Sequence, residues 1–421
     1  MATVTEELAR ILATARAYSQ TRAAFLGTHD RDHALTLLRE AANASGVEFY
    51  LFSPASRQRW NSSKFVYENC GQACADPNAL LQSAGAIKMP ALIAFEEFLP
   101  LLRTDGGDRA ARVQLADMLS GSSRSEAHLL VFVEPPETET HIPNTVGGHV
   151  SRFSLPMPAP RDLTLVAREE ILSTAHVRHQ NLQPQVVEEW SRRFASALAG
   201  LTQSAARFSM QDTLLNKTPD FPAALSCLQD QKSRLLSQRL RMRILDASTA
   251  DPPIGLDYVY EYLRYNRHRI GVPGRDRAKG ILLVGPPGTG KSQFARSASR
   301  FLGMPELVEF RIAALMHSLL GATENRFAEA LAVLDAMAPV CVFINEIEKA
   351  FGDDSGSEST GGTMLRAVGS LLSWMSDSES ATFTIATAIP VIQEPGSPDD
   401  IHGAVRNRAA IAAHDLDIVP I

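Results

Sequence analysis

Two short runs of uninterrupted apolar residues stand out in the second half of the chain. They cover Gly280–Val284 and Val340–Ile344, and each is followed at once by glycine or asparagine, as is typical of buried parallel strands. Between them, apolar residues recur at i, i+3, i+4 and i+7 in residues 327–334, which predicts an amphipathic helix. A further helix is expected over residues 293–302 and a further strand over residues 383–386. Strands that alternate with helices predict a parallel α/β sheet.

The first 200 residues repeat this alternation more weakly. Helices are expected over residues 34–42 and 109–119. Strands are expected over residues 47–52, 91–94 and 129–133. The two α/β halves are therefore candidates for distant copies of one fold.

Three regions follow from these patterns. Residues 1–160 are expected to form one α/β domain, residues 161–250 a mostly helical connector, and residues 251–421 a second α/β domain. Within the connector, basic residues interleave with leucines over residues 221–245, which predicts a single basic amphipathic helix. Such a helix more often faces solvent or an interface, and nucleic-acid contact is the alternative.

Composition narrows the class of protein. The 421 residues are 45% hydrophobic and 21% charged, which excludes disorder along the whole chain. A net charge of −6 argues against a general nucleic-acid binder, and four cysteines exclude a disulfide scaffold. The first residues include Glu6 and Glu7 and no apolar core, so no signal peptide is expected. No apolar run reaches about 18 residues, and we expect a cytoplasmic protein without membrane insertion.

The strongest chemical signal is the sequence GPPGTGKS, which matches G-x-x-x-x-G-K-[ST] between a predicted strand and a predicted helix. Glycines let successive backbone N–H groups surround phosphate oxygens, and the helix adds its positive N-terminal end. The lysine places a cation on the β- and γ-phosphates, and the serine offers its hydroxyl to Mg²⁺. ATP and Mg²⁺ are the predicted cofactors. The predicted nucleotide-binding residues are Gly285, Pro286, Pro287, Gly288, Thr289, Gly290, Lys291 and Ser292.

A second acidic element is expected at the end of the strand Val340–Ile344. The usual pattern there is Asp-Glu, in which the aspartate holds magnesium through water and the glutamate polarises the attacking water. This chain has Asn345 and Glu346 instead. Asparagine keeps the hydrogen-bonding shape but loses the charge that attracts a divalent cation. Glu346 is the predicted catalytic residue, with a surface carboxylate as the less favoured interpretation.

The segments GILLVGPPGTGKS, VCVFINEIEKAF and SGSESTGGTMLRAVGSLLSWM together resemble an AAA-type ATPase module, a P-loop NTPase fold with a parallel sheet. More narrowly, the chain resembles a two-module family of conserved reading frames from cyanobacteria and algal chloroplasts. In that family a degenerate AAA-like module without a P-loop precedes one complete AAA module. GVEFYLF, MPALIAFEEFLPLL and AHLLVFVEPPE look like the degenerate module. The first half has no G-x-x-x-x-G-K, so no phosphate site is expected there.

The chain also departs from the pattern of this family. The family has an asparagine that orients the lytic water where this chain has Ile389. Its paired arginines, which reach the γ-phosphate of the neighbouring subunit, best match Arg406 and Arg408, and a solvated surface pair is about as well supported. The helical lid that normally follows the last core strand is expected to be absent.

Two functions follow as hypotheses. The first is a slow ATPase that assembles into a homo- or hetero-oligomer and remodels or regulates a protein partner, whose identity the sequence does not give. The alternative is a nucleotide-gated scaffold with little or no hydrolysis. Polypeptide threading is disfavoured because residues 316–324 carry no aromatic side chain, and nucleic-acid loading has only the basic helix in its favour.

Overall fold

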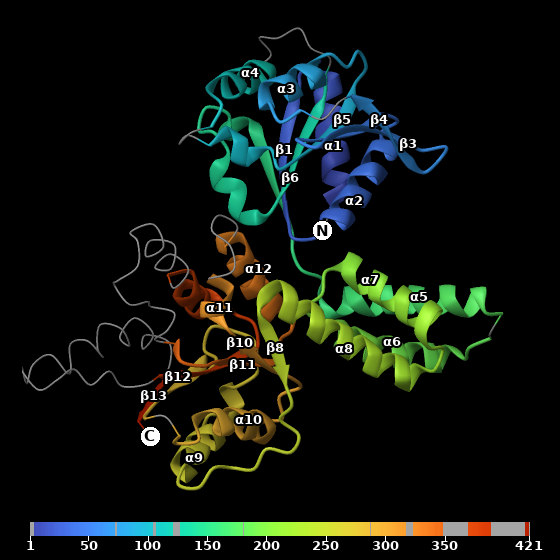
Figure 1. The fold of residues 1–421 in the computed structure, drawn as a ribbon. Helices are drawn as coiled ribbons and strands as arrows, with labels where there is room; N and C mark the ends of the chain where they lie inside the picture. Colours follow the sequence, from blue (N-terminus) through green and yellow to red (C-terminus); the bar gives the residue numbers. More distant parts are fainter. Residues whose placement is uncertain are drawn as a thin grey trace, which may run out of the picture. The chain divides into compact units, whose positions relative to one another are not determined.

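The computed structural model describes residues 4–71, 74–103, 107–120, 127–179, 181–286, 288–316, 323–347, 369–388 and 417–420. The chain forms two compact units (Figure 1). The first unit comprises Met1–Met157 and Thr202–Ser204, and the second comprises Pro158–Leu201 and Ala205–Ile421. No helix in the described ranges is long and apolar enough to cross a bilayer.

The described part of the first unit holds a seven-stranded sheet in the order β4-β3-β2-β5-β6-β1-β7. Strands β2, β5, β6, β1 and β7 are parallel, and β3 and β4 add an antiparallel hairpin at one edge. The bounds are β1 (Arg22–Thr28), β2 (Glu48–Ser53), β3 (Ser56–Asn61), β4 (Val66–Gly71), β5 (Ala91–Glu96), β6 (Leu129–Glu134) and β7 (Val150–Leu155).

Helices cover both faces of this sheet because its central strands are apolar on both sides. The helices are α1 (Val4–Ala17), α2 (Arg31–Ala44), α3 (Pro77–Gly85) and α4 (Arg109–Ser120). Leu12 of α1 and Leu38 of α2 pack with Leu26 of β1 on one face. On the other face, Leu81 of α3 and Leu115 of α4 belong to the core that includes Phe25 and Phe132.

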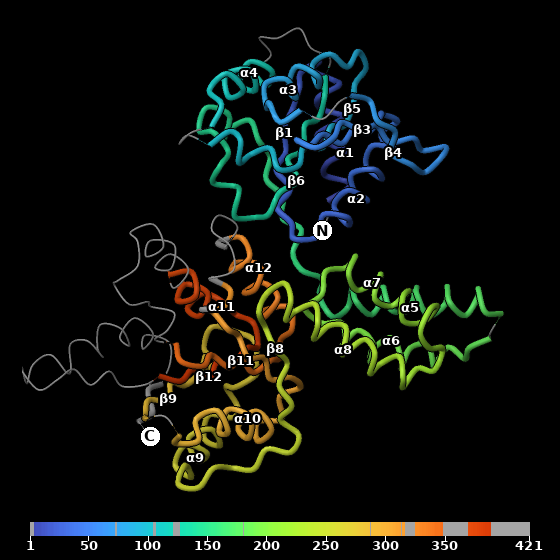
Figure 2. The backbone as a smooth tube through the Cα atoms, viewed as in Figure 1, coloured from blue at the N-terminus to red at the C-terminus, as the bar shows by residue number. Residues whose placement is uncertain are grey.

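The second unit begins with a helical bundle (Figure 2). Its elements are α5 (Pro160–Val177), α6 (Pro184–Leu198), α7 (Gln203–Gln211), the π-helical segment η4 (Asp212–Lys217) and α8 (Phe221–Leu240), with Gln203 and Ser204 assigned to the first unit. The prediction of one helix over residues 221–245 is wrong at its end. Arg241 has a left-handed φ of 55° that ends α8, and Met242–Leu245 forms strand β8. Basic residues between apolar ones fit a strand as well as a helix over so short a stretch.

The sheet that follows has the order β13-β9-β12-β11-β10-β8 among the described residues. All pairs are parallel except β8 with β10. The strands are β9 (Gly280–Val284), β10 (Leu307–Phe310), β11 (Val340–Ile344), β12 (Thr382–Ala388) and β13 (Asp417–Pro420). The helices are α9 (Asp257–Tyr265), α10 (Lys291–Leu302), α11 (Ile312–Met316) and α12 (Thr323–Ala336), and residues 369–377 are also helical.

The parallel cores of the two sheets have the same strand order. Numbered along the chain, the parallel strands run 2-3-4-1-5 across the first sheet, as β2-β5-β6-β1-β7. The second sheet gives the same order, as β10-β11-β12-β9-β13. The predicted α/β class with parallel sheets is confirmed, and the shared order is what two copies of one fold require. The separate boundary at residue 250 stays a prediction.

Candidate nucleotide site

The loop between β9 and α10 needs glycine at two of its positions. Gly288 and Gly290 have φ of 86° and 82°, and Gly290 caps the N-terminus of α10. A Cβ on Gly290 would lie 3.2 Å from Cβ of Pro253, so the segment before α9 approaches the loop closely here. Positive φ and close approach are the two conditions that favour glycine. Pro287 lies outside the described residues.

Lys291 is buried inside this loop. Its Nζ donates to the carbonyl oxygens of Gly285 and Pro286, both at 2.7 Å. The Thr289 hydroxyl donates to the same Pro286 carbonyl at 3.0 Å. The loop thus closes around a positive charge at the N-terminal end of a helix, which is the place where a phosphate binds best. Ser292, in the first turn of α10, is exposed and accessible to a ligand.

The predicted acidic element lies at the same edge of the sheet. Strand β12 lies between β9 and β11, so about 10 Å separates β9, which leads into the loop, from β11, which ends at Ile344. Asn345 is exposed and Glu346 is half-buried with a left-handed φ of 53°. Gly285 N–H donates to the carbonyl of Ala388 at 3.2 Å, which ties the loop to β12.

Thr387 of β12 connects the two residues and was missed by sequence reasoning. It is completely buried. Its Oγ1 accepts the Glu346 N–H at 2.9 Å and donates to Oδ1 of Asn345 at 2.9 Å. A hydroxyl at the carboxyl end of a buried strand was the available signal, but its partners depend on how β11 and β12 pair.

Asn345 and Glu346 line a cavity of about 390 Å³ beside the ends of β10 and β11. Its other polar walls include Arg243 of β8, Glu309 of β10 and Arg311. Arg243 Nη1 lies 3.8 Å from Oε2 of Glu309, so the Glu309 carboxylate has a cation beside it. The predicted arginines Arg406 and Arg408, and Ile389, lie outside the described residues.

The equivalent edge of the first unit is built differently. Thr28 ends β1 and Arg31 begins α2, so two residues stand where the second unit has the six residues 285–290. Asp30 caps α2 by accepting the His33 N–H at 3.2 Å. A carboxylate therefore occupies the N-terminal end of the helix, where a phosphate would otherwise bind.

The third parallel strand of the first unit also ends in acidic residues. Glu97 has a φ of 52°, close to that of Glu346. The residue before it, Glu96, is buried and lies 2.7 Å from Nε of Arg31. Burial raises the pKa of Glu96 even though Arg31 lowers it. The arginine of α2 and the glutamate of β5 thus fill this edge with an internal ion pair.

The comparisons with known proteins agree with this geometry. Residues 281–414 match the family described as "ATPase family associated with various cellular activities (AAA)". Residues 281–414 are thus similar to the AAA family of ATPases. The predicted AAA recognition and fold are confirmed.

Among the relatives of this chain, the AAA domain-containing protein ycf46 of Pyropia yezoensis is 25% identical over 258 residues, 59% of this chain and 49% of that protein. The ycf46 protein of Guillardia theta is 24% identical over 308 residues, 72% and 57% of the two chains. The ATP-dependent zinc metalloprotease FtsH 3 of Synechocystis sp. is 33% identical over 135 residues, 32% and 21% of the two chains. The chain spans about half the length of the ycf46 relatives that it matches.

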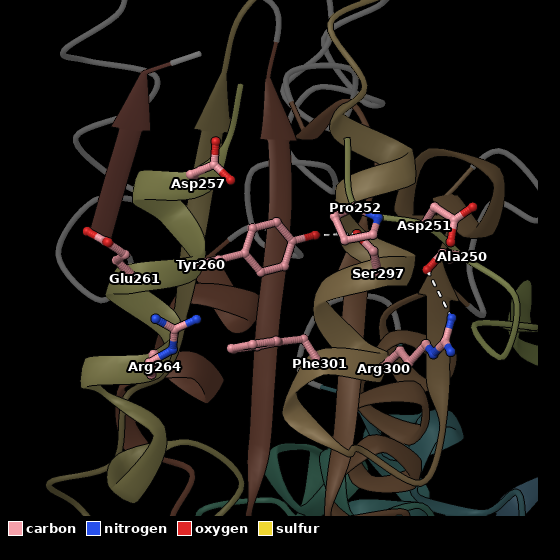
Figure 3. A pocket seen from close by; sticks show the side chains of 10 residues that line it. All are labelled: Ala250, Asp251, Pro252, Asp257, Tyr260, Glu261, Arg264, Ser297, Arg300 and Phe301. Atoms are coloured by element: carbon pink, nitrogen blue, oxygen red, sulfur yellow. Dashed lines mark hydrogen bonds between the residues drawn. The ribbon is translucent and has the colours of Figure 1, made fainter. Parts of the chain in front are cut away.

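A second cavity in this unit, of about 640 Å³, lies between α9 and α10 (Figure 3). Tyr260 reaches across from α9, and its hydroxyl hydrogen-bonds Oγ of Ser297 (Figure 3). The segment before α9 is held to α10, because Gln293 Nε2 donates to the Asp251 carbonyl at 3.1 Å. These contacts position the segment that approaches Gly290, so they shape the nucleotide loop from outside.

Proposed function

We propose that the AAA module binds ATP at residues 285–292 and hydrolyses it slowly, as part of an oligomer that remodels or regulates a protein partner. The observation that carries ATP binding is the position of Lys291, whose ammonium is held by two loop carbonyls at the N-terminus of α10. An arriving triphosphate offers stronger acceptors than these carbonyls, so Nζ can exchange one set of partners for the other.

Magnesium fits this site at one position. The exposed hydroxyl of Ser292 can hold the ion together with phosphate oxygens. Mg²⁺, when bound, neutralises phosphate charge. Asn345 supplies no carboxylate, and its Oδ1 already accepts the Thr387 hydroxyl. The protein's contribution to holding the ion is therefore smaller than in a site with aspartate at this place.

Glu346 is the proposed general base. It lies on the strand end two positions along the sheet from the nucleotide loop, and Thr387 holds its backbone N–H. A carboxylate placed there can orient and polarise a water that attacks the γ-phosphate. Arg406 or Arg408 of a neighbouring subunit is proposed to supply the remaining positive charge, so turnover should rise with assembly.

The alternative is a nucleotide-gated scaffold with little hydrolysis. The loss of the aspartate at Asn345 favours it, as does the first unit, whose equivalent edge is filled by Asp30 and the Arg31–Glu96 pair. A protein partner remains proposed in both cases. Neither case invokes nucleic acid, and the predicted cytoplasmic location stays a prediction.

Phosphate release with ATP and Mg²⁺, measured over a range of protein concentrations, separates the two functions. The proposed ATPase gives a specific activity that rises with concentration, and Asn345→Asp increases it. The scaffold gives no turnover at any concentration. Rapid turnover by dilute monomer, or an Asn345→Asp variant no faster than wild type, contradicts the proposed mechanism.

A further inference from the structure

The amide group of Asn345 has a defined orientation. A threonine hydroxyl carries one proton, and a backbone N–H can only donate. Because Thr387 Oγ1 accepts the Glu346 N–H, its own proton is available to an acceptor, and that acceptor is Oδ1 of Asn345 at 2.9 Å. Thr387 is completely buried, so water does not compete for its hydroxyl. Oδ1 is therefore used inside the protein.

This orientation leaves the Nδ2 amino group as the part of Asn345 that a ligand can meet. The residue is exposed and lines the cavity at the ends of β10 and β11. An amide nitrogen donates hydrogen bonds and accepts none. Waters bound to a metal ion need acceptors, whereas phosphate oxygens are themselves acceptors. The exposed group of Asn345 is thus matched to a phosphate oxygen and mismatched to the hydration shell of a cation.

We propose that Asn345 donates its Nδ2–H to a terminal phosphate oxygen of the bound nucleotide, and that ATP consequently binds almost as well without Mg²⁺ as with it. The inference rests on the proposed ATP site. Thr387 is the positioning residue, since it fixes which end of the amide faces the nucleotide. Asn345 then stabilises the phosphate by a direct hydrogen bond, and does not help to hold Mg²⁺ through its bound water.

Calorimetric titration of the full chain with ATP, in excess Mg²⁺ and in excess EDTA, tests this proposal. For the wild type we expect the two dissociation constants to agree within about threefold. Asn345→Asp places negative charge beside the phosphates, so affinity in EDTA should fall at least about tenfold while affinity in Mg²⁺ is kept. Asn345→Leu, of similar size, loses the donor and should weaken binding in EDTA by about tenfold.

Thr387 provides the matched pair of controls. Thr387→Ser keeps the hydroxyl and should keep the wild-type ratio of the dissociation constant in EDTA to that in Mg²⁺. Thr387→Val lets the Asn345 amide turn, and this ratio should rise. A wild-type affinity that collapses in EDTA overturns the inference, as does an Asn345→Leu variant that binds like wild type in EDTA. Failure of ATP to bind with and without Mg²⁺ overturns the proposed function itself, which is a separate result.

Discussion

The two units present the same strand order but opposite chemistry at the carboxyl edge of the sheet. In the second unit, a glycine-containing loop surrounds the ammonium of Lys291 at a helix N-terminus. In the first unit, the loop is four residues shorter and the carboxylate of Asp30 caps the helix. Strand order therefore does not determine phosphate binding. Loop length and the sign of the charge at the helix N-terminus do.

The glutamate after the third parallel strand gives a second comparison. Glu97 and Glu346 share the left-handed φ, so this backbone geometry belongs to the fold and does not by itself indicate catalysis. Their preceding residues differ. Glu96 is paired with Arg31 inside the first unit, whereas Asn345 is exposed beside a cavity. The first unit uses its polar groups for its own stability, and the second leaves them available to a ligand.

The largest expected effect is a loss of ATP turnover that occurs at Glu346 and not at Glu97. Glu346→Gln removes the general base and should lower ATP turnover by at least about 100-fold while ATP still binds. Glu97→Gln, the same change at the equivalent place in the first unit, should leave turnover unchanged. Phosphate release and nucleotide titration measure both variants. Equal losses of turnover would mean that the two edges act together.

The next effect concerns the first residues of α10 and α2, the helices that follow the first parallel strand of each sheet. Lys291→Ala removes the cation at the phosphates and should weaken ATP binding by at least about tenfold. Arg31→Ala should leave ATP affinity unchanged, because Arg31 is engaged with Glu96. Calorimetric titration compares the two variants under one condition. An unchanged affinity in Lys291→Ala would remove the basis for the proposed site.

A smaller effect is expected on the stability of the first unit. Arg31→Met leaves the buried Glu96 carboxylate without its cation, and the free energy of unfolding should fall by about 1–2 kcal/mol. Adding Glu96→Gln should recover most of this loss, since no buried charge then remains. Urea unfolding of the single and double variants provides the measurement. A double variant as unstable as Arg31→Met would show that packing, and not charge, is responsible.

The smallest effect depends on pH. Burial raises the pKa of Glu134 to about 7, from an ordinary value of 4.5, and its Oε1 accepts the N–H groups of Phe98 and Leu99. The folded state keeps a proton that the unfolded state releases between these values, so stability falls as pH rises from 4.5 to 7. Glu134→Gln keeps an acceptor without the charge and should stabilise the first unit by about 1 kcal/mol at pH 8.

The gain from Glu134→Gln should shrink toward pH 5, where the glutamate is largely protonated in the folded state. Burial also lowers the pKa of His128 to about 4, which removes stability as pH falls below 6.5. This second effect is present in wild type and variant alike, so the difference between their melting temperatures isolates Glu134. A difference that is constant from pH 5 to pH 8 would contradict the assignment.

The sequence predicted the elements with strong local signals. The expected strands at residues 91–94 and 129–133 correspond to β5 and β6, and the runs Gly280–Val284 and Val340–Ile344 are β9 and β11. Uninterrupted apolar residues identify such buried strands without knowledge of their partners. The sequence Arg22–Thr28 was not predicted as a strand because its alanines and glycine have low β-propensity, although it forms β1 between β6 and β7.

The candidate site could be predicted only where its residues are adjacent in sequence. The loop at residues 285–292 is such a motif. The Thr387 hydrogen bonds and the Arg31–Glu96 pair join residues 42 and 65 positions apart, so they depend on strand register and on helix position. Strand β8 was missed because its strand character comes from pairing with β10. Asp30 was not identified as a helix cap, because the helix predicted over residues 34–42 begins three residues later than α2 (Arg31–Ala44).

The central claim is that one sheet edge binds nucleotide and the other is filled by the protein's own side chains. The stoichiometry of ATP binding to the full chain tests it most directly. Calorimetric titration should give one ATP per chain for the wild type. In Lys291→Ala the affinity of this single site should fall at least about tenfold, and no other site should appear. Two ATP molecules per chain, or one that remains bound with unchanged affinity in Lys291→Ala, would contradict the account.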